Sequence, residues 1–368
     1  MTIERVLSYI SSHFFKFGIA AYFLGHLPST YDPIDGGYFS SISWKLTSFH
    51  MNYVDFGFIK RGVVGTAFRP LFDVLDDGGY GEILSVIAFD FVSFLAIIYV
   101  FSRACDIILR DSGSLITYLK SVAVLSPLGI TQVAYDVGRF DHLNYLILVL
   151  CIILIAKQKL ILAGFAAAFG ILVHEAFFIY GVPIMIAYAV SKREEPWRFY
   201  VLLFTVLYCA VIVLFYGNAS VAPDSILSED VTFGMEVWSR GLFIRKLPLS
   251  AIHYVIIIPY IFSSYLLLYI IYTNNNLKFD WIFASTFFPF ALFVVGEDYF
   301  RWSHIVMMVV IAAIFIKSTE GPLRFSSPKL RLRDAPLLLL ILPLGPIGVD
   351  MGFPVASKII EVLGGSPW

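Results

Sequence analysis

Long apolar stretches alternate along this chain with short segments that carry most of its charged residues. A bilayer core of about 30 Å is crossed by about 20 helical residues, so each stretch is a candidate span. The eleven candidates lie near Tyr9–Leu27, Ile83–Phe101, Ile116–Ala134, Leu143–Ala156, Leu160–Val173, Ala176–Val190, Phe199–Tyr216, Ser250–Tyr272, Trp281–Val295, Ile305–Ile316 and Ala335–Val349. The pattern predicts an all-α fold, a polytopic transmembrane helical bundle of about 11 spans.

Some of these spans are short. Leu160–Val173 has only fourteen residues, and it meets the next apolar stretch at His174 and Glu175 with almost no loop between. Short helices that meet at polar residues line wet cavities, because bare backbone does not face lipid. We therefore expect some short or re-entrant helices in the bundle.

The orientation follows from the positions of the basic residues. With the N-terminus placed in the cytoplasm, sixteen of the 26 Lys and Arg residues fall in inside segments and ten in outside segments. Cytoplasmic loops carry the excess of Lys and Arg in membrane proteins. We predict a cytoplasmic N-terminus.

Composition narrows the class of protein. The chain has 368 residues, 59% hydrophobic and 14% charged, with a mean hydropathy of +0.81. Soluble domains carry about 25% charged residues, so an ordinary soluble enzyme, a disordered chain and a disulfide scaffold are excluded. We expect one integral membrane domain over residues 1–368, with membrane lipids as neighbours. The sequence has no basic tail of the kind that would indicate nucleic acid, so we expect no nucleic-acid partner.

The outside segments concentrate acids and bases in five clusters. They contain MNYVDFGFIKRGVVGT, YDVGRFDH, VHEAFF, the long loop 217–247 and GEDYFRWSH. Charged groups near hydrocarbon are costly unless they are paired or face a wet cavity. The clusters favour a shared polar site, with structural roles as the alternative: a snorkelling Lys60–Arg61 pair, a capped turn at Arg139, and a helical pair of Glu297 with Arg301.

Arginine suits bidentate binding of phosphate, and a carboxylate can remove a proton from a hydroxyl. We therefore predict a polyprenyl-linked saccharide as substrate, held beside the membrane by its phosphate. The predicted catalytic residues are Asp55, Asp141, Glu175 and His174, with Asp55 as the first base candidate. The predicted substrate-binding residues are Lys60, Arg61, Asp136, Arg139, His142, Arg240, Glu297, Asp298 and Arg301.

Several known motifs are absent from the sequence. His174-Glu175 is not followed by the second histidine of HExxH, and no GxSxG elbow, Walker A loop or GxGxxG loop occurs. No Cys/His cluster has the spacing of metal ligands. We predict no metal and no cofactor.

The motifs KRGVVGT, GRFD, an intramembrane HE and EDYFRW resemble multi-span proteins of bacterial surface-polysaccharide clusters. Those proteins resemble GT-C-type glycosyltransferases and polysaccharide polymerases of the Wzy and EpsG type. The resemblance implies transfer of lipid-linked sugars at the outer face of the bacterial inner membrane. Because GT-C enzymes place a catalytic acid in the first extracytoplasmic loop, it also implies such a role for Asp55, with Asp32 and Asp35 as competitors.

Two other functions stay open at this point. A transporter or flippase of an anionic or lipid-linked solute needs polar groups reachable from both faces, and Asp90 is the main charge at mid-depth in a span. A membrane acyltransferase that modifies surface glycans could use His174 as its base. No HxxxxD pattern supports the acyltransferase.

Overall fold

The computed structural model describes residues 2–30, 46, 48–75, 80–135, 138–191, 196–216, 251–295, 299–329 and 331–347. This part of the chain is helical and contains no strand. Its helices are α1 Ile3–Ser12, α2 Phe14–Thr30, α4 Tyr53–Phe56, α5 Gly62–Phe72, α6 Tyr80–Ile108, α7 Gly113–Leu125, α8 Ile130–Tyr135, α9 Asp141–Ala156, α10 Leu160–Val173, α11 Phe177–Ser191, α12 Pro196–Tyr216, α14 Ala251–Asn274, α15 Trp281–Ser285, η2 Phe288–Ala291, α16 Leu292–Val295, α17 Tyr299–Ser318, η3 Leu332–Asp334 and α18 Ala335–Leu339.

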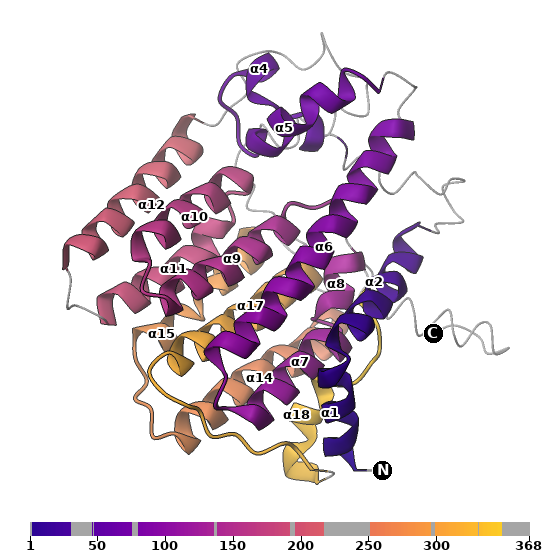
Figure 1. Cartoon of the computed structure of the whole chain (residues 1–368), viewed down its shortest axis with the longest axis vertical. Coiled ribbons are helices and arrows are strands. Elements are labelled where there is room, and N and C mark those ends of the chain that lie inside the picture. Colours follow the sequence, from indigo (N-terminus) through magenta and orange to yellow (C-terminus); the bar gives the residue numbers. More distant parts are fainter. Residues whose placement is uncertain are drawn as a thin grey trace, which may run out of the picture.

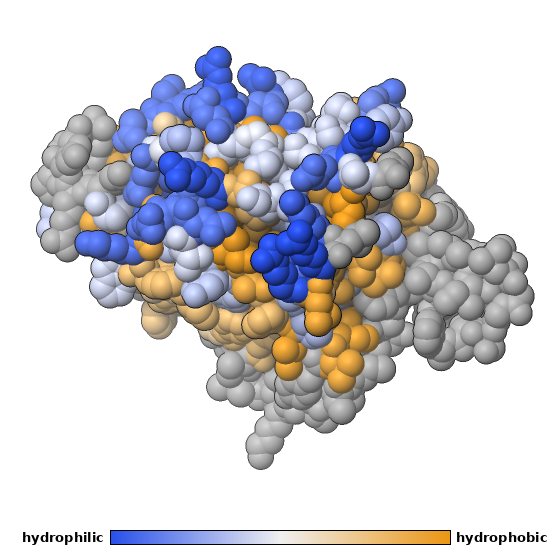
Figure 2. Space-filling model, turned by 90° about the horizontal axis from the view of Figure 1, so that it is seen from below, coloured by the Kyte–Doolittle hydropathy of each residue, from blue (hydrophilic) through white to orange (hydrophobic). Residues whose placement is uncertain are grey.

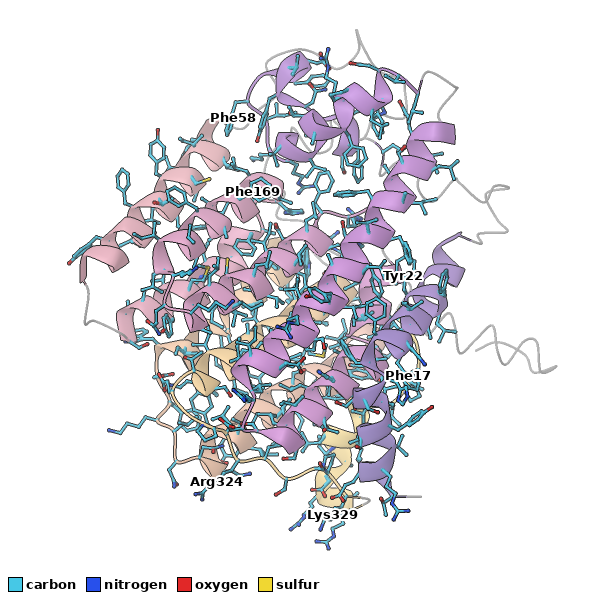
Figure 3. All side chains as sticks on the ribbon, viewed as in Figure 1. Phe17, Tyr22, Phe58, Phe169, Arg324 and Lys329 are labelled. Atoms are coloured by element: carbon cyan, nitrogen blue, oxygen red, sulfur yellow. The ribbon has the colours of Figure 1, made fainter. Side chains whose placement is uncertain are left out.

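Four segments are long and apolar enough to cross a membrane: Gly81–Ile108, Gly113–Tyr135, Val255–Asn274 and Tyr299–Ser318. Shorter apolar helices such as α9, α10 and α11 accompany them. Large apolar side chains remain exposed on the bundle, among them Phe169, which is labelled in Figure 3. An exposed apolar surface of this kind suits contact with lipid. The all-helical fold is confirmed for the described residues, and the four long apolar helices indicate a membrane protein.

The helix α17 forms the centre of the bundle. All twenty of its residues are buried, and it contacts α6, α9, α11 and α14 (Figure 1). A helix that is apolar all round is stable when other helices cover it on every side. Its only Lys and Arg residues, Arg301 and Lys317, lie near its two ends, and both are buried.

Close helix contacts are made where glycine allows them. A Cβ added at Gly25 would lie 2.4 Å from the carbonyl oxygen of Thr131, so a larger residue would push α2 away from α8. On the other side of the bundle, α10 packs between α9 and α12. These contacts fix the ends of α8 and α9, where candidate site residues lie.

The structure corrects the last predicted span. In the described part of Ala335–Val349, only the five residues of α18 are α-helical, and residues 342–347 are not helical. Pro343 and Pro346 lack backbone donors, and Gly345 has a left-handed φ of 77°, so a helix does not continue there. The segment is held instead by Gln132, whose side-chain amide exchanges hydrogen bonds of 2.9 and 3.2 Å with the backbone of Ile347.

Two further predicted spans are interrupted. Tyr9–Leu27 is divided at His13 into α1 and α2, and Trp281–Val295 is divided into α15, η2 and α16. The second break lies beside Phe288-Pro289. Proline disfavours the α-helical conformation of the residue that precedes it. Length alone therefore overstated the continuity of these two segments.

The bundle has two different ends. The short helices α4 and α5 cover one end, which we call the α4–α5 end, and the N-terminus and α18 lie at the other, the α1–α18 end (Figure 1). Figure 2 shows hydrophilic residues gathered over the face at the α1–α18 end, where Arg324 and Lys329 lie (Figure 3). Both of these basic side chains are exposed.

Candidate functional site

The polar link between α10 and α11 is an ordered break in the helical path. His174 is extended, with φ −156° and ψ 122°, while its backbone N–H still donates to the Gly170 carbonyl at 2.9 Å. Its own carbonyl accepts a 3.1 Å hydrogen bond from the side chain of Asn144. The imidazole Nδ1 of His174 accepts a 3.1 Å hydrogen bond from the backbone N–H of Ala176. The break therefore satisfies its own backbone and fixes the direction of both side chains in the link.

Glu175 forms a bidentate ion pair with Arg61. The two guanidinium–carboxylate distances are 2.6 and 3.0 Å, the planar fork geometry in which this pair is strongest. Arg61 precedes α5 and has a left-handed backbone with φ 64°. A left-handed backbone costs a non-glycine residue free energy. The ion pair holds Arg61 in this conformation and ties the α4–α5 segment to the helix break.

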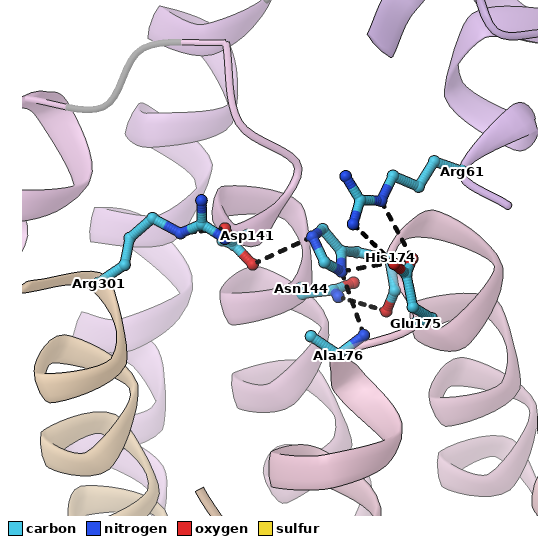
Figure 4. Close-up of polar contacts among 7 residues, drawn as sticks. All are labelled: Arg61, Asp141, Asn144, His174, Glu175, Ala176 and Arg301. Carbon is cyan, nitrogen blue, oxygen red and sulfur yellow. Dashed lines mark hydrogen bonds and ion pairs between the residues drawn. The ribbon is translucent and has the colours of Figure 1, made fainter. Parts of the chain in front are cut away.

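Asp141 and Arg301 form a second ion pair on the other side of His174. The distance from Arg301 Nε to Asp141 Oδ2 is 3.1 Å, and the two side chains are 9% and 11% exposed. His174 Nε2 lies 3.9 Å from Asp141 Oδ1, and His174 Nδ1 lies 3.6 Å from Glu175 Oε2. Figure 4 shows the resulting row of side chains, which we call the Arg301 cluster: Arg61, Glu175, His174, Asp141 and Arg301.

The charges of the two linker residues follow from their surroundings. Burial, together with the nearby Arg61 guanidinium, lowers the pKa of His174 to about 4. Burial alone would raise the pKa of Glu175, but the charge of Arg61, the neighbouring His174 and the hydrogen bonds to the carboxylate together outweigh burial, and that pKa falls below its ordinary range. At neutral pH the imidazole is therefore uncharged, whereas the carboxylate is ionised and poorly suited to accept a proton.

A cavity of about 30 Å³ lies beside the Arg301 cluster. A water needs roughly 10–15 Å³ of such volume, so the cavity accommodates about two waters. Asp141 and Arg301 form part of its wall, together with Arg139 and His142. The remaining lining residues are Gln132, Val133, Tyr145, Leu148, Tyr180, His304, Ile305 and Met308.

The structure thus brings together seven of the residues predicted from sequence. Glu175 and His174 join Asp141 and Arg301 in one cluster with Arg61, and Arg139 and His142 line the adjoining cavity. Lys60 lies in the turn before Arg61. The predicted residues Asp136, Arg240, Glu297 and Asp298, and the competitors Asp32 and Asp35, lie outside the described residues.

Asp55 does not belong to the Arg301 cluster and makes its contacts elsewhere. It lies on α4, where its carboxylate pairs with Arg69 of α5 at 3.0 Å and accepts a 2.7 Å hydrogen bond from Asn52. The Asn52 side chain also caps α4 by accepting from the backbone N–H groups of residues 54 and 55. These contacts give Asp55 a local role in holding α4 on α5.

Sequence reasoning did not assign His304 or Asp90 to the site. His304 lines the cavity and follows Arg301 by three residues, the spacing that places two side chains on one helix face. Asp90 receives a 2.7 Å contact from His142. A charged residue within an apolar span was the signal for Asp90, but the sequence did not identify its partner.

Among the described residues, no group of three or more His, Cys, Asp or Glu side chains is arranged to hold a metal ion. No family model matches the chain, and no curated protein or solved structure matches it.

Proposed function

We propose that this chain is an integral membrane glycosyltransferase or polysaccharide polymerase that uses polyprenyl-(pyro)phosphate-linked sugars. In this proposal it is a multi-pass protein of the bacterial inner membrane, with a cytoplasmic N-terminus and the α4–α5 end outside. The exposed basic residues at the α1–α18 end support this orientation. The observation that carries the proposal is the meeting of the Arg301 cluster with a buried cavity between apolar helices.

The cavity wall offers two kinds of group that such a transfer needs. Arg139 and Arg301 would hold the (pyro)phosphate, because guanidinium groups match phosphate oxygens and stabilise the charge that grows on the leaving group. Two lining groups can accept the proton of the acceptor hydroxyl, the Asp141 carboxylate and the His142 imidazole. The exposed apolar surface of the bundle suits the lipid tail.

Phosphate would compete with Asp141 for Arg301. The two side chains now pair at 3.1 Å, and the cavity has room for water rather than a sugar. Substrate entry therefore requires Arg301 to exchange one anionic partner for another while the wall opens. Exchange of this kind keeps the buried guanidinium compensated at each stage.

The test compares two arginine-paired aspartates with the same substitution. Asp141→Asn alters the cavity wall, whereas Asp55→Asn alters the pair with Arg69. Each variant is reconstituted in proteoliposomes with a polyprenyl-pyrophosphate-linked oligosaccharide and an acceptor glycan, and new glycosidic bonds are measured by mass spectrometry. We expect at least a 100-fold loss in Asp141→Asn, because the buried Arg301 guanidinium of the cavity wall loses its partner, and activity near that of the wild type in Asp55→Asn.

Three outcomes would overturn the proposal. Near-normal transfer by Asp141→Asn removes the cavity from the reaction, and loss only in Asp55→Asn moves the reaction to α4 and α5. Movement of the lipid-linked sugar across the bilayer without any new bond would instead indicate a transporter or flippase. The insertion of each variant is checked by its elution from size-exclusion chromatography.

A further inference from the structure

A buried carboxylate, Asp90, lies within α6 and is 3% exposed. Three groups reach it: the His142 imidazole at 2.7 Å and the Gly138 backbone N–H at 3.2 Å contact Oδ1, and the Tyr22 hydroxyl donates to Oδ2 at 3.4 Å. They come from α9, from the turn before it, and from α2, which includes Tyr22 (Figure 3). A charge at this depth persists because it is paired and hydrogen-bonded.

The contacts of Asp90 fix the state of His142. An ionised carboxylate accepts all three hydrogen bonds, and it requires the proton of the neutral imidazole to be on Nδ1. The other nitrogen, Nε2, is then left with a lone pair. Because His142 is itself a lining residue of the cavity beside Arg139 and Arg301, it is placed where a substrate hydroxyl would have to lose its proton.

We propose that His142 is the general base of the transfer and that Asp90 is its positioning residue. This inference rests on the proposed function and narrows its two candidate bases to one. The alternative base, Asp141, is held by Arg301 at 3.1 Å, and a carboxylate next to a guanidinium gives up basicity. A neutral imidazole with its proton on Nδ1 keeps a lone pair on Nε2, and histidine is the side chain that most often serves as a general base.

The step balances without any further reactant. The acceptor hydroxyl oxygen attacks the anomeric carbon of the lipid-linked sugar while its proton passes to His142 Nε2. The bond from the anomeric carbon to the phosphate oxygen breaks, and its electron pair leaves with the polyprenyl pyrophosphate. The imidazolium is stabilised by Asp90 and then releases its proton to water, as in other Asp–His arrangements.

Charged and titratable groups surround His142 on several sides, and each contributes to its pH response. Asp90 faces it from α6, with Tyr22 of α2 behind that carboxylate. The other lining groups are Arg139 before α9, Asp141 and Tyr145 of α9, Tyr180 of α11, and Arg301 and His304 of α17.

The experiment distinguishes a His142 that acts as a general base from a His142 that only holds α9 against α6 through its contact with Asp90. The full-length protein is labelled with ¹⁵N-histidine, and the imidazole nitrogen shifts of its seven histidines are recorded, with His142→Gln used to assign one of them. We expect wild-type His142 to carry its proton on Nδ1, and Asp90→Asn to shift that proton toward Nε2. Transfer should fall about 10²–10⁴-fold in His142→Gln, the range for loss of a general base.

The dependence of the transfer rate on pH supplies a readout that a purely structural His142 would not change. Removal of the Asp90 charge destabilises the imidazolium, so the acidic limb of the rate profile should move to lower pH in Asp90→Asn. Asp90→Glu, which keeps the charge, should recover part of the rate. An active His142→Gln, or a wild-type His142 with its proton on Nε2, overturns this inference alone. A wild-type protein that transfers no sugar overturns the proposed function and the role of base together.

Discussion

The two ends of α17 solve the same electrostatic problem in different ways. Arg301 and Lys317 are buried cations sixteen residues apart on one apolar helix, a rise of about 24 Å. Lys317 contacts two carboxylates, Asp280 at 2.9 Å and Glu320 at 2.7 Å, and Tyr272 donates to Asp280. Arg301 pairs with Asp141 at 3.1 Å, and both line a cavity.

The difference lies in the surroundings of each pair. The two carboxylates around Lys317 are partly exposed, 27% each. They neutralise the charge of the buried ammonium while remaining in contact with water themselves. Asp141 is only 11% exposed and is shared with His174, and the Arg301 guanidinium adjoins the cavity. A compensated cation beside water serves as an anchor for the helix end. A buried pair that adjoins a cavity is able to exchange its partner for a ligand.

The largest expected difference in sugar transfer is between two double variants, one without the Arg301–Asp141 pair and one without the Lys317–Asp280 pair. Deletion of a whole buried ion pair is often tolerated, so both double variants should fold. Arg301→Met with Asp141→Asn should reduce sugar transfer at least 100-fold, because the phosphate loses its guanidinium. Lys317→Met with Asp280→Asn should stay within about twofold of wild type, in line with our anchor assignment. Equal loss in both would erase the distinction between the two ends.

The Lys317 end should contribute to stability rather than to transfer. Lys317→Met alone leaves Asp280 and Glu320 without their shared cation, and because both carboxylates are 27% exposed the cost should lie below the about 3–5 kcal/mol of a fully buried pair. We expect a clear fall in the apparent melting temperature in detergent, which the Asp280→Asn double variant partly restores. A melting temperature unchanged from wild type would show that Lys317 does not anchor α17.

The helix break at His174 should make the folding stability of the protein depend on pH. Because burial holds the pKa of folded His174 near 4 against an ordinary 6.5, the unfolded chain binds a proton more readily in that interval. Stability is therefore complete above about pH 6.5 and falls toward pH 4, by up to roughly 3 kcal/mol. In His174→Asn, whose amide oxygen can replace Nδ1 as acceptor, the fall between these two pH values should be smaller. An identical fall would assign it to other groups.

The smallest expected effect concerns the link to α5. Arg61→Gly relieves the left-handed backbone but removes the partner of Glu175, for a net cost of about 1–3 kcal/mol at neutral pH. The pKa of Glu175 should then rise, because burial acts without the opposing charge. The variant should therefore regain stability relative to wild type as the pH is lowered, and Glu175→Gln should suppress the defect. A defect that does not vary with pH would indicate a backbone role for Arg61.

The sequence predicted the apolar framework better than the contacts within it. Leu160–Val173 has the same bounds in the structure, because hydropathy and the polar residues after it act locally. The span predicted over Ala335–Val349 failed because prolines and a left-handed glycine outweigh hydropathy. Pairing was harder still: Arg301 lies four residues from Glu297, yet the contact that the structure describes is with Asp141, 160 positions away.

The candidate residues were recovered in part for the same reason. The sequence identified Asp141, Glu175 and Arg301 as charged residues at the ends of apolar stretches, which is a one-dimensional property. It also ranked Asp55 first, although its ion-pair partner is Arg69, only fourteen residues along the chain. Whether a charge faces a local partner or a cavity depends on helix packing, which no short motif encodes.

The most direct test of our central claim is a density map of the protein in nanodiscs with a non-transferable polyprenyl-pyrophosphate sugar analogue. We predict phosphate density within hydrogen-bond distance of the guanidinium groups of Arg139 and Arg301, with Asp141 moved away from Arg301 and the cavity enlarged. Phosphate density beside Asp55 and Arg69, or a saturating analogue that leaves the cavity closed and the Arg301–Asp141 pair intact, would contradict the account.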